Sequence, residues 1–364
     1  MYLKGINSLR FFAAMLVVIY HCNDGLRTAS PELVYDLAIF KKGAFAVDLF
    51  FVISGFLLTY LALSEIQKKG FLNIRRFFYR RILRIFPLYY LGVFLGFFLL
   101  GVIYPILMGS VYFDFRISEV LWYYLGFLPN YPIVRWENIG PMYSLWSIGV
   151  EEQFYLFFPM IMILMTKWRR DLLLAISLFS VYLFFYLSVF YHQVVMPFWL
   201  QEMIILTLRF HYLFMGMVFG VAFFFNKDHS FFRFIGHKVI QLIIYLSFVA
   251  HLFLVSSNHP VSNLFSALLF SFILINGVRE VSLVNLEQRH LNYLGIISYG
   301  IYIFHPYVSL VLRYAMVKWS GLNQWVFAWP LFFHLLVSMV SILVAALSYK
   351  YYESYFLRLK VRYK

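Results

Sequence analysis

The chain has 364 residues, of which 63% are hydrophobic and 13% are charged. Soluble domains carry about 25% charged residues, so this composition excludes an ordinary soluble enzyme. The net charge of +14 would favour nucleic acid in a soluble chain, but in a membrane protein it must first be tested against the side of the membrane on which basic residues fall. The single cysteine, Cys22, excludes an internal disulfide.

Ten apolar runs, each near the length that crosses about 30 Å of hydrocarbon, predict an all-α polytopic membrane protein. They cover residues 8–24, 43–64, 87–108, 142–166, 171–191, 207–226, 238–256, 262–278, 292–314 and 326–349. If the N-terminus is cytoplasmic, the segments between spans on the cytoplasmic side, with Arg10 and Lys238 at their edges, hold 22 of the 30 lysine and arginine residues. This asymmetry follows the positive-inside rule, explains the charge without nucleic acid and places both termini in the cytoplasm. We expect one transmembrane domain, residues 1–357, and a basic cytoplasmic tail, residues 358–364.

Residues 119–134 (EVLWYYLGFLPNYPIV) are apolar but short, and Pro129 and Pro132 interrupt them. Counting them as a span would place the basic residues of 167–170 outside. We therefore expect a re-entrant or interfacial segment, which is tolerated where protein or a cavity covers its backbone.

The first span carries an arginine, Arg10, and a histidine, His21, separated by ten residues. Eleven helical steps place the two within about 20° of one face and about 16 Å apart along the axis. A charge at bilayer depth costs about 2.5 kcal/mol or more, so both are expected to face a bundle interior or a wet cavity. The alternative is a snorkelling arginine and a histidine at the opposite headgroup level.

The second span carries Asp48 near its outer end, followed by Ser54 and Gly55. Asp48 and His21 lie at the outer ends of consecutive antiparallel helices, so the carboxylate is in a position to fix the imidazole tautomer. Equally, Asp48 could neutralise another group, and Ser54-Gly55 could be a small-residue helix contact.

Three further features carry charge or aromatic side chains. The predicted inner loop, residues 65–86, ends in three arginines at helical spacing: Arg80, Arg81 and Arg84. They suit the phosphates of a nucleotide or coenzyme A, but they also fit a juxtamembrane cluster that faces anionic lipid. Glu151 and Glu152 lie inside an apolar helix, where a carboxylate is a candidate functional group. Because adjacent helical residues diverge by about 100°, at most one can face a given cavity squarely. Tyr143 and Trp146 fit an interfacial belt as well as a sugar-stacking platform.

Five stretches, in this order, resemble the membrane-bound acyltransferase-3 family: INSLRFFAAMLVVIYH, VDLFFVISGFLLT, RRILRIFPLYYL, SLWSIGVEEQFYLFFP and SYGIYIFHP. Each is weakly specific alone, but together they extend over about residues 5 to 357. Members are integral-membrane O-acyltransferases that modify envelope carbohydrates such as lipopolysaccharide O-antigen and peptidoglycan. The resemblance implies O-acetylation in a bacterial inner membrane, with acetyl-CoA as donor and a carbohydrate, free or lipid-linked, as acceptor.

The resemblance also implies residue roles. The implied catalytic residues are His21, Arg10, Glu151 and Asp48. His21 would be a general base or a transient acyl carrier, Arg10 would orient the donor or stabilise the thioester oxygen, and the carboxylates would set the protonation of these groups. The residues expected to hold the donor are Arg80, Arg81, Arg84 and Tyr89. The residues expected to contact the acceptor are Tyr143, Trp146 and Ser147. This mechanism requires one continuous hollow between the arginines and His21.

Two features depart from the family's pattern. Leu145 stands where a threonine usually precedes the tryptophan. We expect no hydrolase-fold domain after the spans, so a second transfer step would fall to the bundle or to a separate protein.

Other readings remain. Cys22 is expected to pack rather than to act as a nucleophile, because it diverges from His21 on the helix. His305 could line the cavity, although a structural hydrogen bond is favoured. The histidines lack metal-ligand spacing, so no metal is expected. The alternative to an enzyme is a transporter or flippase of an acyl donor or lipid-linked sugar. The R-x-x-R motif, formed by Arg81 and Arg84, favours the enzyme because it suits coenzyme A.

Overall fold

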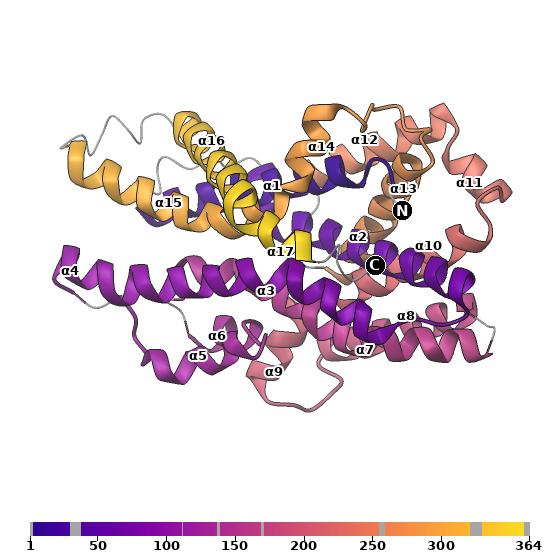
Figure 1. Ribbon diagram of the computed structural model, residues 1–364, viewed down its shortest axis with the longest axis horizontal. Helices are drawn as coiled ribbons and strands as arrows, with labels where there is room; N and C mark the ends of the chain where they lie inside the picture. Colours follow the sequence, from indigo (N-terminus) through magenta and orange to yellow (C-terminus); the bar gives the residue numbers. More distant parts are fainter. Residues whose placement is uncertain are drawn as a thin grey trace.

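A computed structural model describes residues 3–29, 38–110, 112–136, 139–168, 171–254, 259–320 and 330–359 (Figure 1). Within these ranges the regular structure is helical and no strand occurs, which confirms the all-α class. The longer helices are α1 (Ile6–Ala29), α2 (Gly43–Lys69), α3 (Ile74–Phe98), α7 (Trp146–Trp168), α8 (Asp171–Phe190), α10 (Phe210–Phe225), α12 (Lys238–Leu254), α13 (Pro260–Val278), α15 (Ser298–Ser320) and α16 (Pro330–Ser348). The short helices are α4 (Tyr104–Met108), α5 (Ile117–Leu125), α6 (Asn130–Arg135), α9 (Phe198–Glu202), α11 (Ser230–Ile235), α14 (Arg289–Ile296) and α17 (Ser354–Leu359).

In the described part of the chain, eight helical segments are long and apolar enough to cross a membrane. The pair α14–α15, bent by 64°, makes a ninth if it is one span. The helix α12 is apolar but shorter, with 17 residues. Each of the ten predicted spans thus has a helical counterpart. The basic tail predicted at 358–364 lies largely outside the described residues, as does the start of the span predicted at 326–349.

The span predicted at 87–108 begins too late. Helix α3 starts at Ile74, and a π-helical turn (Leu99–Ile103) joins it to α4, so one apolar segment extends over residues 74–108. The predicted inner loop of residues 65–86 shrinks to a turn between Gly70, a left-handed helix cap, and Asn73, whose side chain accepts a hydrogen bond from the backbone of Arg76. Arginine is a good helix former, so the basic cluster belongs to the first turns of α3.

The apolar segment predicted not to span the membrane forms two short helices, α5 and α6, and neither is among the candidate spans. Polar side chains satisfy the backbone where the two helices meet. Tyr89 donates to the Tyr124 carbonyl over 2.9 Å, and the amide of Gln153 donates to the Phe127 carbonyl over 2.9 Å. Side chains of α3 and α7 therefore satisfy two carbonyls of this irregular backbone, while Gly126 is exposed.

The most closely packed helix pair is α2 with α10, which cross on glycines. A methyl group added at Gly55 would lie 2.0 Å from the Leu213 carbonyl oxygen, and one at Gly216 would lie 2.2 Å from the Val52 carbonyl oxygen. Small residues let helix backbones approach closely inside a membrane bundle. Of the Ser54-Gly55 pair, Gly55 is therefore the helix contact, and α2 is the most buried of the candidate spans.

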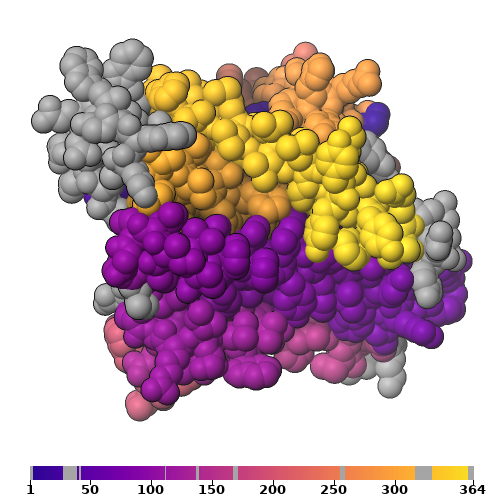
Figure 2. Space-filling view, turned by 60° about the vertical axis from the view of Figure 1, so that its left-hand side comes forward, coloured from indigo at the N-terminus to yellow at the C-terminus, as the bar shows by residue number. Residues whose placement is uncertain are grey.

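The two ends of the described chain meet on one side of the bundle. Leu3 and Asn7, at the start of α1, line the same pocket as Tyr349 and Leu357, near the end of the chain. The C-terminal helices lie directly against α3 (Figure 2), where the hydroxyl of Tyr352 donates to a carbonyl of α3.

Candidate active site

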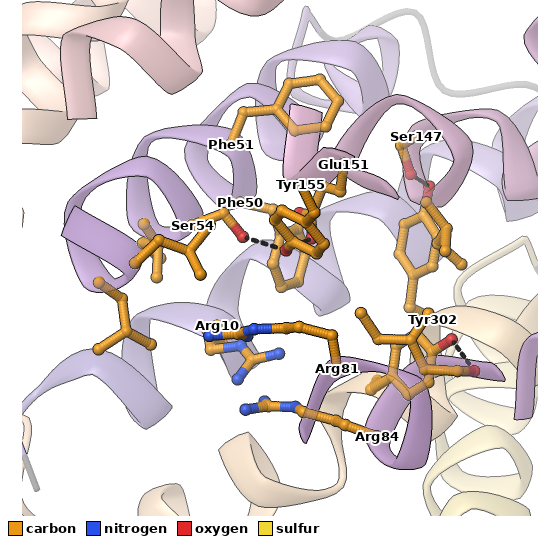
Figure 3. A pocket seen from close by; sticks show the side chains of 16 residues that line it. Arg10, Phe50, Phe51, Ser54, Arg81, Arg84, Ser147, Glu151, Tyr155 and Tyr302 are labelled. Atoms are coloured by element: carbon orange, nitrogen blue, oxygen red, sulfur yellow. Dashed lines mark hydrogen bonds between the residues drawn. The ribbon is translucent and has the colours of Figure 1, made fainter. Parts of the chain in front are cut away.

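A pocket between α1, α2, α3, α7 and α15 gathers three arginines and one glutamate, and we call it the basic pocket (Figure 3). It holds about 780 Å³ of space between atoms. Its polar lining consists of Arg10, Ser54, Arg81, Arg84, Ser147, Glu151, Tyr155, Tyr299 and Tyr302. These helices are far apart in sequence, so the pocket exists only in the folded bundle.

Three guanidinium groups enter the basic pocket, from Arg10 on α1 and from Arg81 and Arg84 on α3, and their nitrogen-bearing ends lie side by side (Figure 3). Within the described ranges, none of the three forms a salt bridge. The Arg81 guanidinium lies 5.4 Å from the centre of the Tyr155 ring, a cation–π distance. The three side chains are half-buried, and positive charges so close together repel one another, so the cluster favours binding of an anion with several charges.

The single carboxylate of the basic pocket, Glu151, is held by a chain of hydroxyl groups. Tyr155 donates to Glu151 Oε2 over 2.5 Å, and the Ser54 hydroxyl lies 3.2 Å from the Tyr155 hydroxyl. Because the proton of Tyr155 goes to Glu151, Ser54 is the donor in the second bond. Glu152 does not line the pocket, as the divergence of adjacent helical positions predicts.

The basic pocket continues into two neighbouring hollows. The first, which we call the lysine groove, shares Leu58 and Arg81 with it. The second, the C-terminal pocket, shares Arg10 and Arg84 with it and adds the carboxylate Glu353. Across the three hollows the basic lining residues are Arg10, Lys68, Lys69, Arg76, Arg80, Arg81 and Arg84, and the acidic ones are Glu65, Glu151 and Glu353. The combined surface is therefore strongly positive.

The other end of α1 opens into a separate hollow, the histidine pocket, with about 1730 Å³ of space between atoms. Its polar and aromatic lining includes Tyr20, His21, Asp24, Tyr112, Arg135, Trp136, Tyr143, Ser144 and Arg313. Arg10 lines the basic pocket and His21 lines the histidine pocket. Both side chains of the predicted pair thus face cavities, and they face two different ones.

The expectation of one continuous hollow is wrong for this conformation, because the basic pocket and the histidine pocket share no lining residue. The side chain of Tyr302 lies between them. It lines the basic pocket, its hydroxyl lies 2.7 Å from that of Ser147, and it donates over 2.8 Å to the carbonyl of Ser144, which lines the histidine pocket. A layer containing one tyrosine therefore separates the two ends.

His21 contacts a second histidine. Its Nδ1 lies 2.7 Å from Nε2 of His305, and Nδ1 of His305 lies 3.1 Å from the carbonyl oxygen of Ile301. The ring of Tyr143 meets the His21 ring edge-on, with centroids 6.1 Å apart. His305 is fully buried.

Asp48 does not contact His21. Its two oxygens accept hydrogen bonds from Nη1 of Arg209 on α10, over 3.1 and 2.8 Å, and both side chains are almost fully buried. The structure thus realises the alternative in which Asp48 neutralises another group. The sequence could not reveal this partner, because 161 residues separate the two.

The other predicted site residues divide between pocket and core. Arg80 lines the lysine groove and Tyr143 the histidine pocket, whereas Ser147 lines the basic pocket, on the side away from His21. Tyr89 lines none of the four hollows: it is buried, and its ring stacks on Phe127. Trp146 is also buried, packed edge-on against Phe51, and lines none of them.

Three side chains at these sites, Tyr302, His305 and Glu353, were not among the site residues predicted from the sequence. Tyr302 and His305 stand three residues apart in SYGIYIFHP, a spacing that places them on one helix face, and this signal was available in the sequence. Glu353 falls in a predicted cytoplasmic segment, and a π-helical turn (Tyr349–Glu353) carries it into the bundle. No group of three or more histidine, cysteine, aspartate or glutamate side chains that could hold a metal ion occurs among the described residues.

The fold and the site define an integral-membrane helical bundle with a half-buried arginine cluster at one end of α1 and a histidine at the other. The family model described as "Acyltransferase domain" matches residues 3–349, and the chain therefore belongs to this acyltransferase family. This confirms the family that the five motifs predicted.

Two similar proteins illustrate the relationship. The O-acetyltransferase OatA of Staphylococcus aureus is 34% identical over 166 residues, 44% of this chain and 24% of OatA. The peptidoglycan O-acetyltransferase OatA of Listeria monocytogenes is 28% identical over 178 residues, 47% of this chain and 26% of that protein. The matched segment thus spans about a quarter of the length of these relatives. No solved structure matches the chain.

Proposed function

We propose that this protein is an O-acetyltransferase that moves an acetyl group from cytosolic acetyl-CoA to a hydroxyl of an envelope carbohydrate. The observation that carries this proposal is the half-buried cluster of Arg10, Arg81 and Arg84, which forms no salt bridge among the described residues and lies at the opposite end of α1 from His21. Membership of an acyltransferase family supports the reaction class. The excess of basic residues around the lysine groove supports a cytoplasmic location for that end.

The donor would bind with its charged end in the lysine groove. Coenzyme A carries a diphosphate and a phosphate, and arginine forks match phosphate oxygens with paired hydrogen bonds. Seven basic side chains against three acidic ones line the three connected hollows, an excess that suits such a polyanion. Arg81, shared by the groove and the basic pocket, would mark the point where the pantetheine arm turns inward.

The acceptor would bind in the histidine pocket. Aromatic rings with adjacent polar groups, here Tyr20, Tyr143 and Trp136 beside Asp24, are the usual means of binding a sugar ring. The names of both relatives describe O-acetyltransferases, and one acts on peptidoglycan. We therefore propose a peptidoglycan-like glycan as acceptor.

In the proposed reaction, His21 takes the proton of a sugar hydroxyl as that oxygen attacks the thioester carbonyl carbon. The resulting tetrahedral oxyanion collapses, the carbon–sulfur bond breaks, and the proton passes from the imidazolium to the coenzyme A sulfur. Arg10 lines the basic pocket and not the histidine pocket, so it would orient the donor rather than contact the oxyanion beside His21. For the thioester to reach His21, the side chain of Tyr302, which separates the basic pocket from the histidine pocket, must move aside.

The test uses the full chain, purified in lipid nanodiscs and incubated with acetyl-labelled coenzyme A and soluble peptidoglycan fragments. Thiol release together with label on the glycan is expected, and both should be lost in His21→Ala. Absence of both from the wild-type protein, with glycan or donor carried across vesicle membranes instead, would overturn the enzyme in favour of a transporter.

The donor site has a matched control on the same helix. Arg84 lines the basic pocket, whereas Arg75 is exposed on α3 and lines none of the four hollows. Arg84→Ala should weaken acetyl-CoA binding about 10- to 100-fold, because a hydrogen bond to a charged group contributes about 1.5–3 kcal/mol. Arg75→Ala should leave binding unchanged, and equal effects of both variants would contradict the assignment.

A further inference from the structure

The contact between the two histidines has a geometry that defines its chemistry. The two rings are inclined by 8°, and their centroids lie 5.0 Å apart while the nitrogens lie 2.7 Å apart. Nearly parallel rings with so long a centroid separation and so short a nitrogen contact lie edge to edge, in one plane. The contact is therefore an in-plane hydrogen bond between Nδ1 of His21 and Nε2 of His305, in line with the lone pair that an imidazole nitrogen offers.

The direction of this bond follows from the other end of His305. A carbonyl oxygen only accepts, so Nδ1 of His305 must donate its proton to the Ile301 carbonyl. No carboxylate is hydrogen-bonded or ion-paired to His305 among the described residues, and its side chain is fully buried, so the ring is neutral. A neutral ring that donates from Nδ1 accepts at Nε2, and the donor to Nε2 is then Nδ1 of His21.

We propose that His305 is a positioning residue that holds His21 in the tautomer with a proton on Nδ1 and a lone pair on Nε2. No hydrogen bond to Nε2 of His21 occurs in the described part of the chain, and His21 lines the histidine pocket. The basic nitrogen is thus available to an acceptor hydroxyl. A buried imidazole here does what a carboxylate does for a catalytic histidine in a catalytic triad, while Asp48 is committed to Arg209.

The role of His305 in catalysis depends on the proposed function, but the tautomer can be measured without any activity. The full chain, labelled with ¹⁵N-histidine and held in lipid nanodiscs, gives long-range nitrogen–proton correlations that identify the protonated nitrogen of each ring. His21→Ala assigns the His21 signals by their loss. The wild-type protein should show His21 protonated on Nδ1.

Two variants of His305 separate hydrogen bonding from packing. His305→Gln retains an acceptor at nearly the position of Nε2, and His305→Met keeps a similar length without a strong acceptor. The Nδ1–H form of His21 should persist in His305→Gln and give way to a mixture in His305→Met. His211→Met is the matched control, because His211 is equally buried and neither of its ring nitrogens has a hydrogen bond in the described structure.

The same variants should divide turnover from binding. In His305→Met, kcat should fall at least tenfold, while acetyl-CoA binding stays unchanged. A loss of this size is part of the factor of about 10²–10⁴ that a positioned general base contributes. His305→Gln should recover most of that loss. An unprotonated Nδ1 on His21 in the wild type, or an unchanged His21 tautomer in His305→Met, would overturn the assignment. If the tautomer is as described and no glycan is acetylated, the proposed function fails and the His305 assignment stands.

Discussion

The hydroxyl of Tyr302 lies 2.7 Å from that of Ser147 and donates to the carbonyl of Ser144 over 2.8 Å. Tyr302 has one proton to give, and it goes to the carbonyl, so Ser147 donates to Tyr302. The three groups close the space between the basic pocket and the histidine pocket. Two hydrogen bonds, each contributing about 0.5–1.5 kcal/mol, thus hold the Tyr302 hydroxyl in the barrier between the two pockets.

Replacing Tyr302 with alanine should uncouple the reaction. With the ring gone, water can pass between the two pockets, and we expect Tyr302→Ala to release coenzyme A thiol without a glycan and to acetylate glycan more slowly. Tyr302→Phe keeps the ring and loses only the hydroxyl, so it should not leak. Thiol release measured with and without acceptor checks both variants. A Tyr302→Ala protein as tightly coupled as the wild type would mean that the barrier lies elsewhere.

Asp48 and Arg209 should behave as a stability pair. Removing one partner of a buried ion pair leaves an uncompensated charge and costs about 3–5 kcal/mol, so Asp48→Ala should lower the thermal unfolding midpoint markedly. The double variant Asp48→Ala/Arg209→Met removes both charges and should recover much of that loss. Thermal melts of the three proteins in one detergent provide the measurement. Equal destabilisation in the single and double variants would argue against the pair.

The close crossing of α2 and α10 predicts a steric effect at Gly216. A side chain there would overlap the Val52 carbonyl oxygen, so Gly216→Leu should separate the helices and destabilise the protein by about 1–3 kcal/mol or more, the usual cost of overpacking. Val218, two residues along the same helix, is only partly buried. Val218→Leu should therefore be tolerated, and similar melting temperatures for both variants would contradict the tight crossing.

Tyr89 should contribute to stability and not to donor binding. Its hydroxyl donates to the Tyr124 carbonyl, and it lines none of the four hollows. Tyr89→Phe should cost about 1 kcal/mol of stability through the lost hydrogen bond and leave the Kd for acetyl-CoA unchanged. Titration of both proteins with the donor is the check. A weakened Kd in Tyr89→Phe would restore the donor role that the sequence suggested.

Much of the site was predictable because it depends on position within single helices. The 3.6-residue repeat alone placed Arg10 and His21 on one face and separated Glu151 from Glu152. Likewise, the R-x-x-R spacing brought Arg81 and Arg84 into one pocket. The start of α3 was predicted incorrectly because strongly basic turns do not look like a membrane span, although arginine favours a helix.

What the sequence by itself determined is the class of protein, the family and the charged residues that face cavities, since composition and helical periodicity are local properties of the chain. Only the tertiary structure decided which partners those residues meet: Arg209 for Asp48, His305 for His21, and Tyr302 between the two pockets. Each of these pairs joins different helices, and the packing of whole helices against one another, down to the close approach at Gly55 and Gly216, sets which side chains come within bonding distance.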